Sequence, residues 1–260
     1  MRQLPSTRSL MNEAGVEPDT DRDQHFLVDD RVLDRVAERT PDDADHVLEI
    51  GGGVGNLTAR LARDHEVTAV ELDADLAEHL RRRFPEVEVV HGDATDVRLP
   101  EFDACVSNLP YSASTPLLFR LLPHGKPLVL LLQREVAERA AATPDDDAYG
   151  RLSVTAAYYA DVDVVETVPP TAFEPQPRVE SAVTEFVPAA RPDVDAELHA
   201  DVVRAAFTQR RKTLRNALAN TTHMTDLERD DVDALPERLL RRRPDALSPE
   251  DYVEITRALE

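Results

Sequence analysis

The chain has 260 residues, of which 42% are hydrophobic, and this composition supports a globular core and excludes global disorder. Its formal net charge of −21 is strongly acidic, and its longest apolar run, residues 127–132, is far too short to span a membrane. The first residues lack the apolar stretch of a signal peptide, and the single cysteine, Cys105, lies in an apolar segment, so we expect a cytoplasmic protein without a membrane partner.

In chain order, residues 1–22 show scattered charges and prolines without a sustained period, and we expect a mobile N-terminal arm. Short apolar segments then alternate with helical patterns, which predicts a doubly wound parallel sheet. The predicted strands are residues 47–50, 67–70, 87–90, 104–107, 128–132, 153–159, 161–168 and 182–187. The predicted helices open after Asp29, at Leu57, at Ala74, at Thr115-Pro116 and at Arg134.

A proline-containing linker at residues 188–192 separates this part from a tail with helical patterns and no strand signal. We therefore predict three regions: the arm at residues 1–22, an α/β domain of the Rossmann-like type at residues 23–188, and a small all-helical domain at residues 193–260. No internal repeat is present in the sequence.

A glycine-rich turn follows the first predicted strand, in the pattern Gly51-x-Gly53-x-Gly55. Such a turn lets backbone amides approach a ligand closely, and Glu71 at the end of the next strand can accept hydrogen bonds from both ribose hydroxyls of an adenosine. Asp93, after the third strand, is a candidate acceptor for the adenine amino group. These residues alone leave both NAD and S-adenosylmethionine open, although the glycine spacing departs from G-x-G-x-x-G and disfavours NAD. Each acid taken singly could also be an ordinary polar strand end.

The fourth strand ends in Asn108-Leu109-Pro110-Tyr111, which places an amide, a proline carbonyl and a ring at the edge where ligands bind in open α/β sheets. The Asn108 oxygen and the Pro110 carbonyl can hold an exocyclic amino group so that its lone pair points at a methyl donor. We predict that Tyr111 stacks on the base and that Phe173 closes its other face. The alternatives are that Asn108-Leu109-Pro110 forms a simple β-turn and that Phe173 is an ordinary core residue.

The histidines do not cluster, and His91 and Asp93 are isolated, so the sequence predicts no metal site. In the tail, we expect Arg204, Arg211 and Arg215 on one helical face, with Arg210 and Lys212 extending this basic patch. The patch predicts RNA binding; a solvated helix face is the alternative.

The acidic charge has three explanations: a solubilising surface, an acidic partner-binding face, or adaptation to molar salt. The scarcity of lysine, with only Lys126 and Lys212 among 30 basic residues, favours the third. At molar salt, like charges repel little, and RNA contacts depend on geometry and bidentate arginine pairing rather than on counterion release.

These motifs together resemble the small-subunit rRNA adenine N6-dimethyltransferases. The resemblance spans residues 24–218 and rests on the segments Gln24-His25-Phe26-Leu27, Glu49-Ile50-Gly51-x-Gly53-x-Gly55-Asn56-Leu57-Thr58, Glu71-Leu72-Asp73, Gly92-Asp93-Ala94, Asn108-Leu109-Pro110-Tyr111, Tyr149-Gly150-Arg151-Leu152-Ser153-Val154, Phe173-x-Pro175-x-Pro177-x-Val179-x-Ser181-Ala182-Val183 and Phe207-Thr208-Gln209-Arg210-Arg211-Lys212-Thr213-Leu214-Arg215-Asn216. Two positions depart from the family pattern: Asp23 stands where glycine is usual, and His25 where asparagine is commoner.

The resemblance implies an S-adenosylmethionine-dependent methyltransferase that dimethylates two adjacent adenosines near the 3′ end of small-subunit rRNA. It implies that the donor is contacted by His25, Leu27, Gly51, Gly53, Glu71, Asp93 and Asn108, and the target base by Asn108, Pro110, Tyr111 and Phe173. The expected partner is rRNA within a pre-30S particle, and the expected state is a monomer. A large-subunit rRNA methyltransferase, a non-catalytic assembly factor and a small-molecule methyltransferase are the alternatives.

Overall fold

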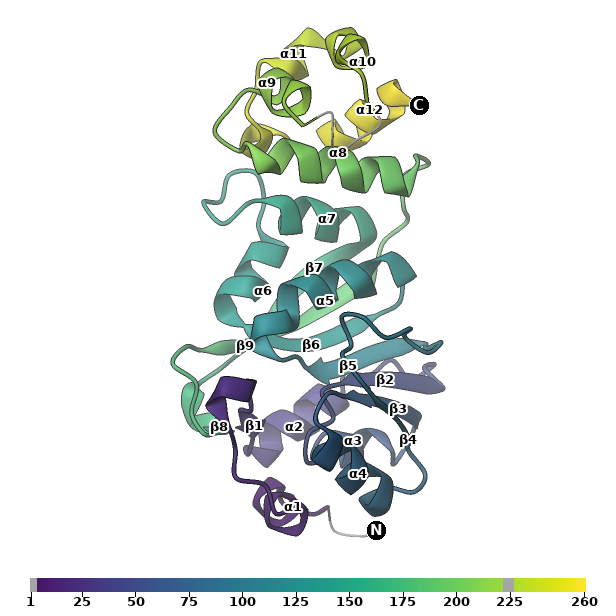
Figure 1. The fold of residues 1–260 in the computed structure, drawn as a ribbon, viewed down its shortest axis with the longest axis vertical. Coiled ribbons are helices and arrows are strands. Elements are labelled where there is room, and N and C mark those ends of the chain that lie inside the picture. The colour runs from purple at the N-terminus through teal and green to yellow at the C-terminus, as the bar shows by residue number, and fades with distance from the viewer. Residues whose placement is uncertain (1–3, 222–226) are drawn as a thin grey trace. The chain divides into compact units, whose positions relative to one another are not determined.

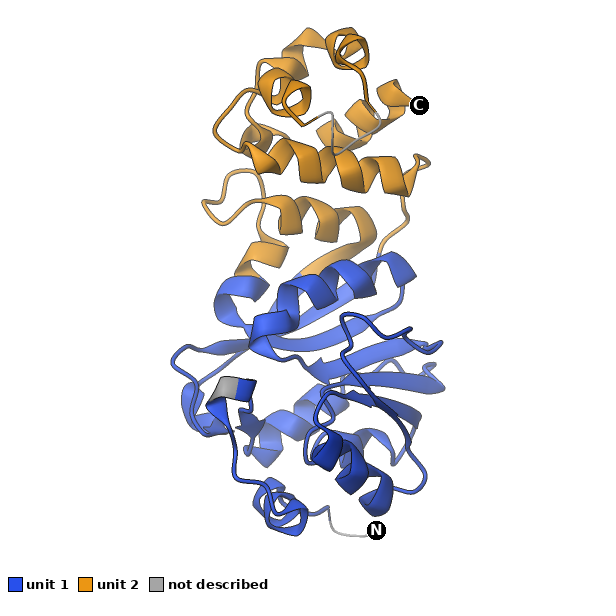
Figure 2. Cartoon of the chain, in the orientation of Figure 1, with its two compact units in different colours: residues 1–137, 163–188 blue, residues 138–162, 189–260 orange. Residues whose placement is uncertain are grey.

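The computed structural model describes residues 4–221 and 227–260 of the chain. It divides into two compact units, which Figure 2 shows in different colours. The first comprises the described part of Met1–Ala137 together with Asp163–Pro188, and the second comprises Glu138–Val162 and the described part of Ala189–Glu260. Within the described ranges, no helix has the length and apolar character needed to cross a membrane.

A seven-stranded sheet organises the described part of the first unit, in the order β4-β3-β2-β5-β6-β9-β7 (Figure 1). The strands are β2 (His46–Ile50), β3 (Glu66–Glu71), β4 (Glu88–His91), β5 (Ala104–Asn108), β6 (Leu128–Gln133), β7 (Ala160–Val168) and β9 (Ser181–Pro188). The strands from β4 to β6 are parallel to their neighbours, whereas β9 is antiparallel to β6. The predicted doubly wound α/β fold is confirmed, but the sheet is mixed rather than wholly parallel.

The order of the sheet positions a binding crevice. From β2 the chain moves outward through β3 and β4, and then returns to add β5 on the other side of β2. Where the direction of winding reverses in this way, the loops after the two central strands diverge and leave a crevice at their carboxyl ends. Ile50 ends β2 and Asn108 ends β5, so the segments that follow both strands border this crevice.

Helices cover both faces of this sheet, as expected for strands that are apolar on both sides. Figure 1 shows α5 on the opposite face from α2 and α4. The helices are α2 (Asp30–Ala37), α3 (Thr58–Leu61), α4 (Ala74–Arg83), α5 (Ser114–Leu121) and α6 (Arg134–Ala141). Aspartates begin two of them: the side chain of Asp29 accepts from the Arg31 amide at the start of α2, and that of Asp73 accepts from the Asp75 and Leu76 amides at the start of α4.

Short elements complete the first unit. A two-stranded antiparallel ribbon joins β1 (Phe26–Leu27) to β8 (Phe173–Glu174). Single helical turns are η1 (Thr20–Arg22), η2 (Tyr111–Ala113), η3 (Leu122–His124) and η4 (Pro170–Ala172). The ribbon brings a segment near the N-terminus beside one almost 150 residues later in the chain, with Leu27 paired to Phe173.

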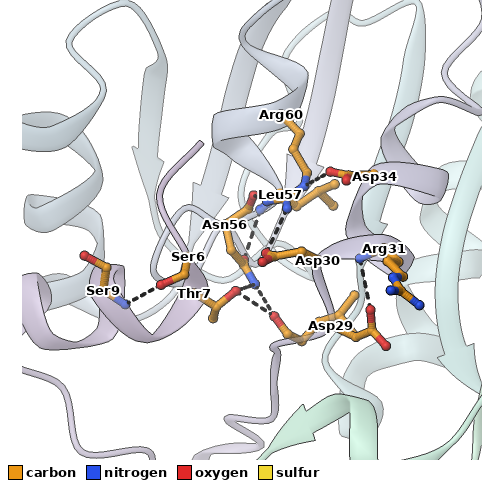
Figure 3. A network of polar contacts seen from close by, with 11 residues as sticks. Ser6, Thr7, Ser9, Asp29, Asp30, Arg31, Asp34, Asn56, Leu57 and Arg60 are labelled. Atoms are coloured by element: carbon orange, nitrogen blue, oxygen red, sulfur yellow. Dashed lines mark hydrogen bonds and ion pairs between the residues drawn. The ribbon is translucent and has the colours of Figure 1, made fainter. Parts of the chain in front are cut away.

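The N-terminal segment contains a helix that the sequence analysis did not predict, α1 (Thr7–Ala14). Leu10 is fully buried and belongs to the main core cluster, so the expectation of an arm without regular structure is wrong for residues 7–14. Thr7 anchors the helix, because its hydroxyl donates to the Leu27 carbonyl (2.9 Å) and accepts from Asn56 (3.3 Å) (Figure 3). The helix is too short to show a period, and its stability comes from these distant contacts.

Figure 3 also shows how Arg60 joins α3 to α2. Its side chain is 4% exposed, and its guanidinium lies 2.7 Å from Asp34 and 2.9 Å from Asp30 and donates to the Asn56 carbonyl at 2.8 Å. A buried arginine with this many acceptors is well compensated for the loss of water. The two helices that flank the glycine-rich turn are therefore fixed to one another.

The described part of the second unit is largely helical. Its helices are α7 (Arg151–Tyr159), α8 (Ala196–Thr208), α9 (Leu214–Ala219), α10 (Arg229–Ala234), α11 (Glu237–Leu240), the single turn η6 (Pro244–Ala246) and α12 (Pro249–Leu259). Its apolar cluster includes Tyr149 and Tyr252, and the Tyr149 hydroxyl donates to the Leu247 carbonyl at 2.8 Å.

The strand predicted at residues 153–159 is wrong, because this segment forms helix α7. Val154, Thr155 and Tyr158 favour strands locally. In the structure, however, α7 packs against α8 and α12, and Val154 and Ala156 are fully buried. Packing around the whole helix outweighs the local preference.

Candidate active site

A cavity of about 880 Å³ opens at the carboxyl ends of β2, β3 and β5. Five segments of the first unit supply most of its walls: Thr20 with the stretch from Arg22 to Leu27, the glycine-rich turn from Glu49 to Gly53, the turn from Val70 to Asp73, the loop from Gly92 to Thr95, and the loop from Asn108 to Ala113. Six further residues complete the lining: Leu33, Asn56, Leu57, Leu76, Pro116 and Leu117. The structure thus brings together all seven residues expected at the donor, which are His25, Leu27, Gly51, Gly53, Glu71, Asp93 and Asn108.

The glycine-rich turn needs its glycines at two of these positions. Gly51 and Gly53 have φ values of +75° and +56°, in the left-handed region that side chains rarely adopt. A Cβ on Gly53 would lie 3.1 Å from the Phe26 ring. The turn therefore leaves its backbone exposed to the cavity, where a ligand can approach closely.

Glu71 faces this turn from the end of β3. One carboxylate oxygen accepts from the Gly53 amide and the other from the Asp73 amide, both at 2.8 Å. Only 6% of the residue is exposed, and this burial raises the pKa of the carboxyl despite the two amides. Each oxygen retains a further lone pair, so the carboxylate can still accept two hydroxyl donors from a ligand.

Asp93 lies in the loop after β4 and is exposed. Its Oδ1 accepts from both the amide and the hydroxyl of Thr95, each at 2.7 Å, and these hydrogen bonds lower the pKa of the carboxyl. The local turn thus holds a charged acceptor at the rim of the cavity.

The loop after β5 carries the residues expected at the target base. The Asn108 side-chain amide donates to the His25 carbonyl at 3.4 Å, while its Oδ1 is buried and has no partner among the described residues. The Pro110 carbonyl already accepts from the Ala113 amide (3.1 Å) and the Ser114 hydroxyl (2.9 Å). Of the two acceptors predicted for an amino group, Asn108 Oδ1 is the one left open.

Tyr111 is held in place from two sides. Its hydroxyl shares a hydrogen bond of 2.6 Å with Ser181, and its ring stacks on His25 at 5.7 Å between centroids and 25° between planes. Burial raises the pKa of the tyrosine. His25 Nδ1 in turn donates to the Pro175 carbonyl at 2.8 Å.

Phe173 is not among the residues that line the cavity. It is 2% exposed and belongs to the main core cluster, where β8 pairs it with Leu27 of β1. The structure therefore does not bring Phe173 together with Asn108 and Tyr111, and its contact with the base stays a prediction.

The sequence analysis missed several residues of the cavity. Glu49, at 2% exposure, lines the wall and accepts from the Thr58 hydroxyl at 2.6 Å, and burial raises its pKa to about 8. An acid inside an apolar strand just before the glycines was the signal for it. Arg22, which also lines the cavity, gave no comparable signal because its contact with Asp73 joins distant segments. The same holds for Ser181, which is outside the lining but binds the Tyr111 hydroxyl.

The basic residues of the tail are arranged differently from the expectation. Helix α8 ends at Thr208 and α9 begins at Leu214, so Arg211 lies between helices, and the single helical face expected for Arg204, Arg211 and Arg215 is wrong. A turn there, closed by the Lys212 amide on the Gln209 carbonyl at 2.8 Å, lets the two helices pack together.

Three of these tail cations have carboxylate partners. Arg204 pairs with Asp201 (2.7 Å), Arg210 with Asp245 (3.1 Å), and Arg215 with both Asp233 and Glu237. Arg211 and Lys212 are exposed and have no ion pair within the described residues. The described residues also contain no group of three or more histidine, cysteine or acidic side chains that could hold a metal ion.

Comparison with known proteins gives a consistent result. Residues 19–237 match the family described as ribosomal RNA adenine dimethylase. A curated relative from Haloarcula marismortui, named probable ribosomal RNA small subunit methyltransferase A, is 52% identical over 95% of this chain and 92% of its own length.

Two solved structures share the fold. A dimethyladenosine transferase from Plasmodium falciparum matches with a TM-score of 0.73 and 26% identity, over 89% of this chain and 96% of the other. The 23S rRNA methyltransferase ErmE matches with a TM-score of 0.64 and 25% identity, over 90% of this chain and 99% of the other.

Proposed function

Because the chain belongs to the ribosomal RNA adenine dimethylase family, we propose that it transfers methyl groups from S-adenosylmethionine to the N6 amino groups of two adjacent adenosines in the 3′-terminal stem-loop of small-subunit rRNA. The observation that carries the proposal is the open acceptor Asn108 Oδ1, which lies at the strand edge beside the glycine-rich turn and Glu71.

The cavity suits the donor. Its volume of about 880 Å³ admits a nucleoside with an amino-acid arm, and the backbone of Gly51 and Gly53 is open to it. Glu71 would accept from the ribose hydroxyls and Asp93 from the adenine amino group, while His25 and Leu27 cover the ligand from the side of β1. When bound, the donor supplies an electrophilic methyl group on sulfur.

The chain's own contribution to the reaction is orientation. An adenine amino nitrogen is a poor nucleophile because its lone pair is delocalised into the ring. Asn108 Oδ1 accepts one amino hydrogen and turns the lone pair toward the methyl group, and the Tyr111 ring holds the plane of the base. As the nitrogen–carbon bond forms, the sulfur–carbon bond breaks with its electron pair going to sulfur, and the nitrogen then loses a proton to water. The same steps with a second molecule of the donor would replace the remaining amino hydrogen and give the dimethylated base.

The second unit is proposed to bind RNA through Arg204, Arg210, Arg211, Lys212 and Arg215. The exposed pair Arg211 and Lys212 supports this, because neither has a carboxylate partner in the described residues. We propose that the enzyme acts as a monomer in the cytoplasm, on rRNA within a pre-30S particle. The division expected from the sequence, at residues 23–188 and 193–260, differs from the two units of the structure because Glu138–Val162 belongs to the second unit. We propose that the first unit carries the chemistry and the second captures RNA.

The test uses the purified full-length chain in high salt with methyl-labelled S-adenosylmethionine. Undermethylated small subunits and large subunits are offered separately, and the label is located by nuclease digestion of the rRNA. We expect label in dimethyladenosine of the 3′-terminal stem-loop of the small subunit. Label confined to large subunits would replace the proposal with the activity named for the ErmE structure, and no label in either would refute an RNA methyltransferase.

A further inference from the structure

Two consecutive residues that line the cavity, Arg22 and Asp23, bind to different walls of it. Arg22 is the last residue of the single turn η1, Asp23 directly follows it, and both line the cavity. Arg22 contacts Asp73 on the wall that carries Glu71, whereas Asp23 contacts Ser112 on the wall that carries Tyr111. The segment therefore connects the expected donor wall with the expected base wall.

The contact of Arg22 supports the donor wall. Arg22 Nη1 lies 2.7 Å from Asp73 Oδ2, and Arg22 Nε lies 3.6 Å from the Asp19 carboxylate in the same segment. The other carboxylate oxygen of Asp73 accepts from the first backbone amides of helix α4. The Asp73 amide itself donates to Glu71 Oε1 at 2.8 Å. Arg22 thus acts on the turn that positions one oxygen of the Glu71 carboxylate.

The contact of Asp23 supports the base wall. Its Oδ2 accepts from the backbone amide of Ser112 at 2.6 Å. Ser112 directly follows Tyr111 in the single turn η2, and an amide at the start of such a turn has no partner within the turn itself. The carboxylate supplies that partner and fixes the backbone next to the Tyr111 ring.

Asp23 makes this contact from an unusual backbone conformation. Its φ of +62° lies in the left-handed region, and Asp23 is the one non-glycine residue with positive φ in the described ranges. Glycine adopts this conformation without strain, and aspartate is among the few other residues that reach it. The chain thus carries a side chain in this left-handed conformation at the position from which its carboxylate binds the Ser112 amide.

We propose that Arg22 and Asp23 form a two-sided clasp, in which Asp23 is a positioning residue for Tyr111 and the target base, and Arg22 a positioning residue for Glu71 and the donor. The proposal rests on the proposed methyl transfer. It assigns separable effects to two neighbouring side chains, because each one contacts a different wall.

The experiment compares Asp23→Ala, Asp23→Gly, Asp23→Asn and Arg22→Gln in the full chain at high salt, with Glu17→Ala as a control for loss of an exposed acid outside the cavity. Three quantities are measured: kcat and KM for methyl transfer, the Kd for S-adenosylmethionine in the absence of RNA, and the amide hydrogen exchange of Ser112.

We expect Asp23→Ala and Asp23→Gly to lower kcat about tenfold with the donor Kd nearly unchanged, since a small misplacement of a base-holding group is costly. Ser112 exchange accelerates in both variants. Asp23→Asn keeps an acceptor and tolerates positive φ, so it recovers most of kcat and of the Ser112 protection. Arg22→Gln raises the donor Kd and KM with kcat unchanged, and Glu17→Ala behaves as the wild type.

Wild-type kcat and Ser112 protection in Asp23→Ala would overturn the clasp. An equal rise of the donor Kd in Asp23→Ala and Arg22→Gln would also overturn it, because the two sides would then not be separate. If Asp23→Gly were as active as the wild type, backbone freedom rather than the carboxylate would matter, and the assignment of Asp23 would fail. If the wild type transfers no methyl group at all, the proposed function fails, while Ser112 exchange and the donor Kd still decide the clasp.

Discussion

Asn108 donates its side-chain amide to the His25 carbonyl, and its Oδ1 is buried without a partner among the described residues. A buried carbonyl oxygen without a partner is costly, so such a group is retained where a ligand supplies the missing donor. The contact with His25 therefore fixes the side-chain amide of Asn108 and leaves its Oδ1 as the acceptor for the amino group in the proposed reaction.

Replacing Asn108 tests this orientation. We expect Asn108→Ala to lower kcat by roughly 100-fold or more, by analogy with the loss of one preorganised hydrogen-bond partner, while S-adenosylmethionine binding stays measurable. Single-turnover methyl transfer and equilibrium dialysis of the donor separate the two effects. The control is Asn12→Ala, which removes an exposed side chain of helix α1. Full activity of Asn108→Ala would contradict the base-holding role.

Protonation of Glu71 is expected to weaken donor binding at low pH. Burial raises the pKa of this carboxyl, so it takes up a proton earlier than an exposed glutamate as the pH falls. The protonated group is a weaker acceptor for ribose hydroxyls, and we therefore expect the donor Kd to rise as the pH falls, with the rise beginning at a higher pH than the titration of an exposed glutamate would give. Glu71→Gln should bind the donor weakly with little pH dependence. A constant wild-type Kd as the pH falls would refute the role of the carboxylate.

Glu49 makes the stability of the first unit depend on pH. Its folded pKa of about 8 lies above the ordinary 4.5, so the folded state holds a proton that the unfolded state releases. This stabilisation is fully present below about pH 4.5 and is lost as the pH rises through about 8, at roughly 1.4 kcal/mol for each pH step. Thermal unfolding should show Tm falling over this range in the wild type. Glu49→Gln should flatten the slope, and an identical slope in the variant would contradict this account.

His199 has the opposite effect in the second unit. It is 3% exposed, its Nε2 has no partner in the described residues, and it stacks on Tyr158 with centroids 4.1 Å apart. Burial lowers its pKa to about 4 from 6.5, so the unfolded state alone takes up a proton between these values. Stability is present above about pH 6.5 and is lost as the pH falls toward about 4, by roughly 3 kcal/mol in total.

His199→Phe, which keeps the stacking on Tyr158, should remove this acid sensitivity. The measurement is unfolding of the second unit, followed by amide exchange in α8 between about pH 7 and about pH 4. Acid sensitivity that persists unchanged in the variant would assign the effect to other groups.

The net charge of −21 predicts a salt requirement for the fold. Lowering the salt from about 1 M to about 0.1 M lengthens the Debye length from about 3 Å to about 10 Å, so repulsion among surface carboxylates grows. We expect loss of helical circular dichroism on dialysis to low salt, and recovery when salt is restored. A non-ionic osmolyte serves as the control. A melting transition that stays sharp and unshifted without salt would contradict adaptation to molar salt.

The sequence predicted the α/β fold and the cluster of donor-site residues because both follow from local rules. Parallel strands end at one edge, so Gly51, Glu71 and Asp93 had to lie near one another once the strands were identified. The strand predicted at residues 153–159 was wrong because Val154 and Tyr158 favour a strand locally, whereas the segment forms helix α7 and Val154 joins the apolar cluster of the second unit.

The remaining features of the site depend on long-range pairing that no local pattern shows. Pro175 and Ser181 reach His25 and Tyr111 through β8 and β9, which lie far along the chain. The short helix α1 exists because Thr7 meets Leu27 and Asn56. The positions of Phe173 in the core and of Arg211 between helices likewise follow from tertiary packing, which overrides local preference.

The late contacts of Tyr111 and His25 set an order for the maturation of the site during synthesis. The described residues that line the cavity end at Leu117, so the chain that forms its walls is translated in the first half of synthesis. The two groups that hold His25 and Tyr111, the Pro175 carbonyl and the Ser181 hydroxyl, emerge more than fifty residues later. Leu27 likewise waits for its strand partner Phe173. During synthesis, therefore, the lining of the cavity is complete as chain before the contacts that hold two of its sides exist, and a product truncated ahead of Phe173 would lack all three.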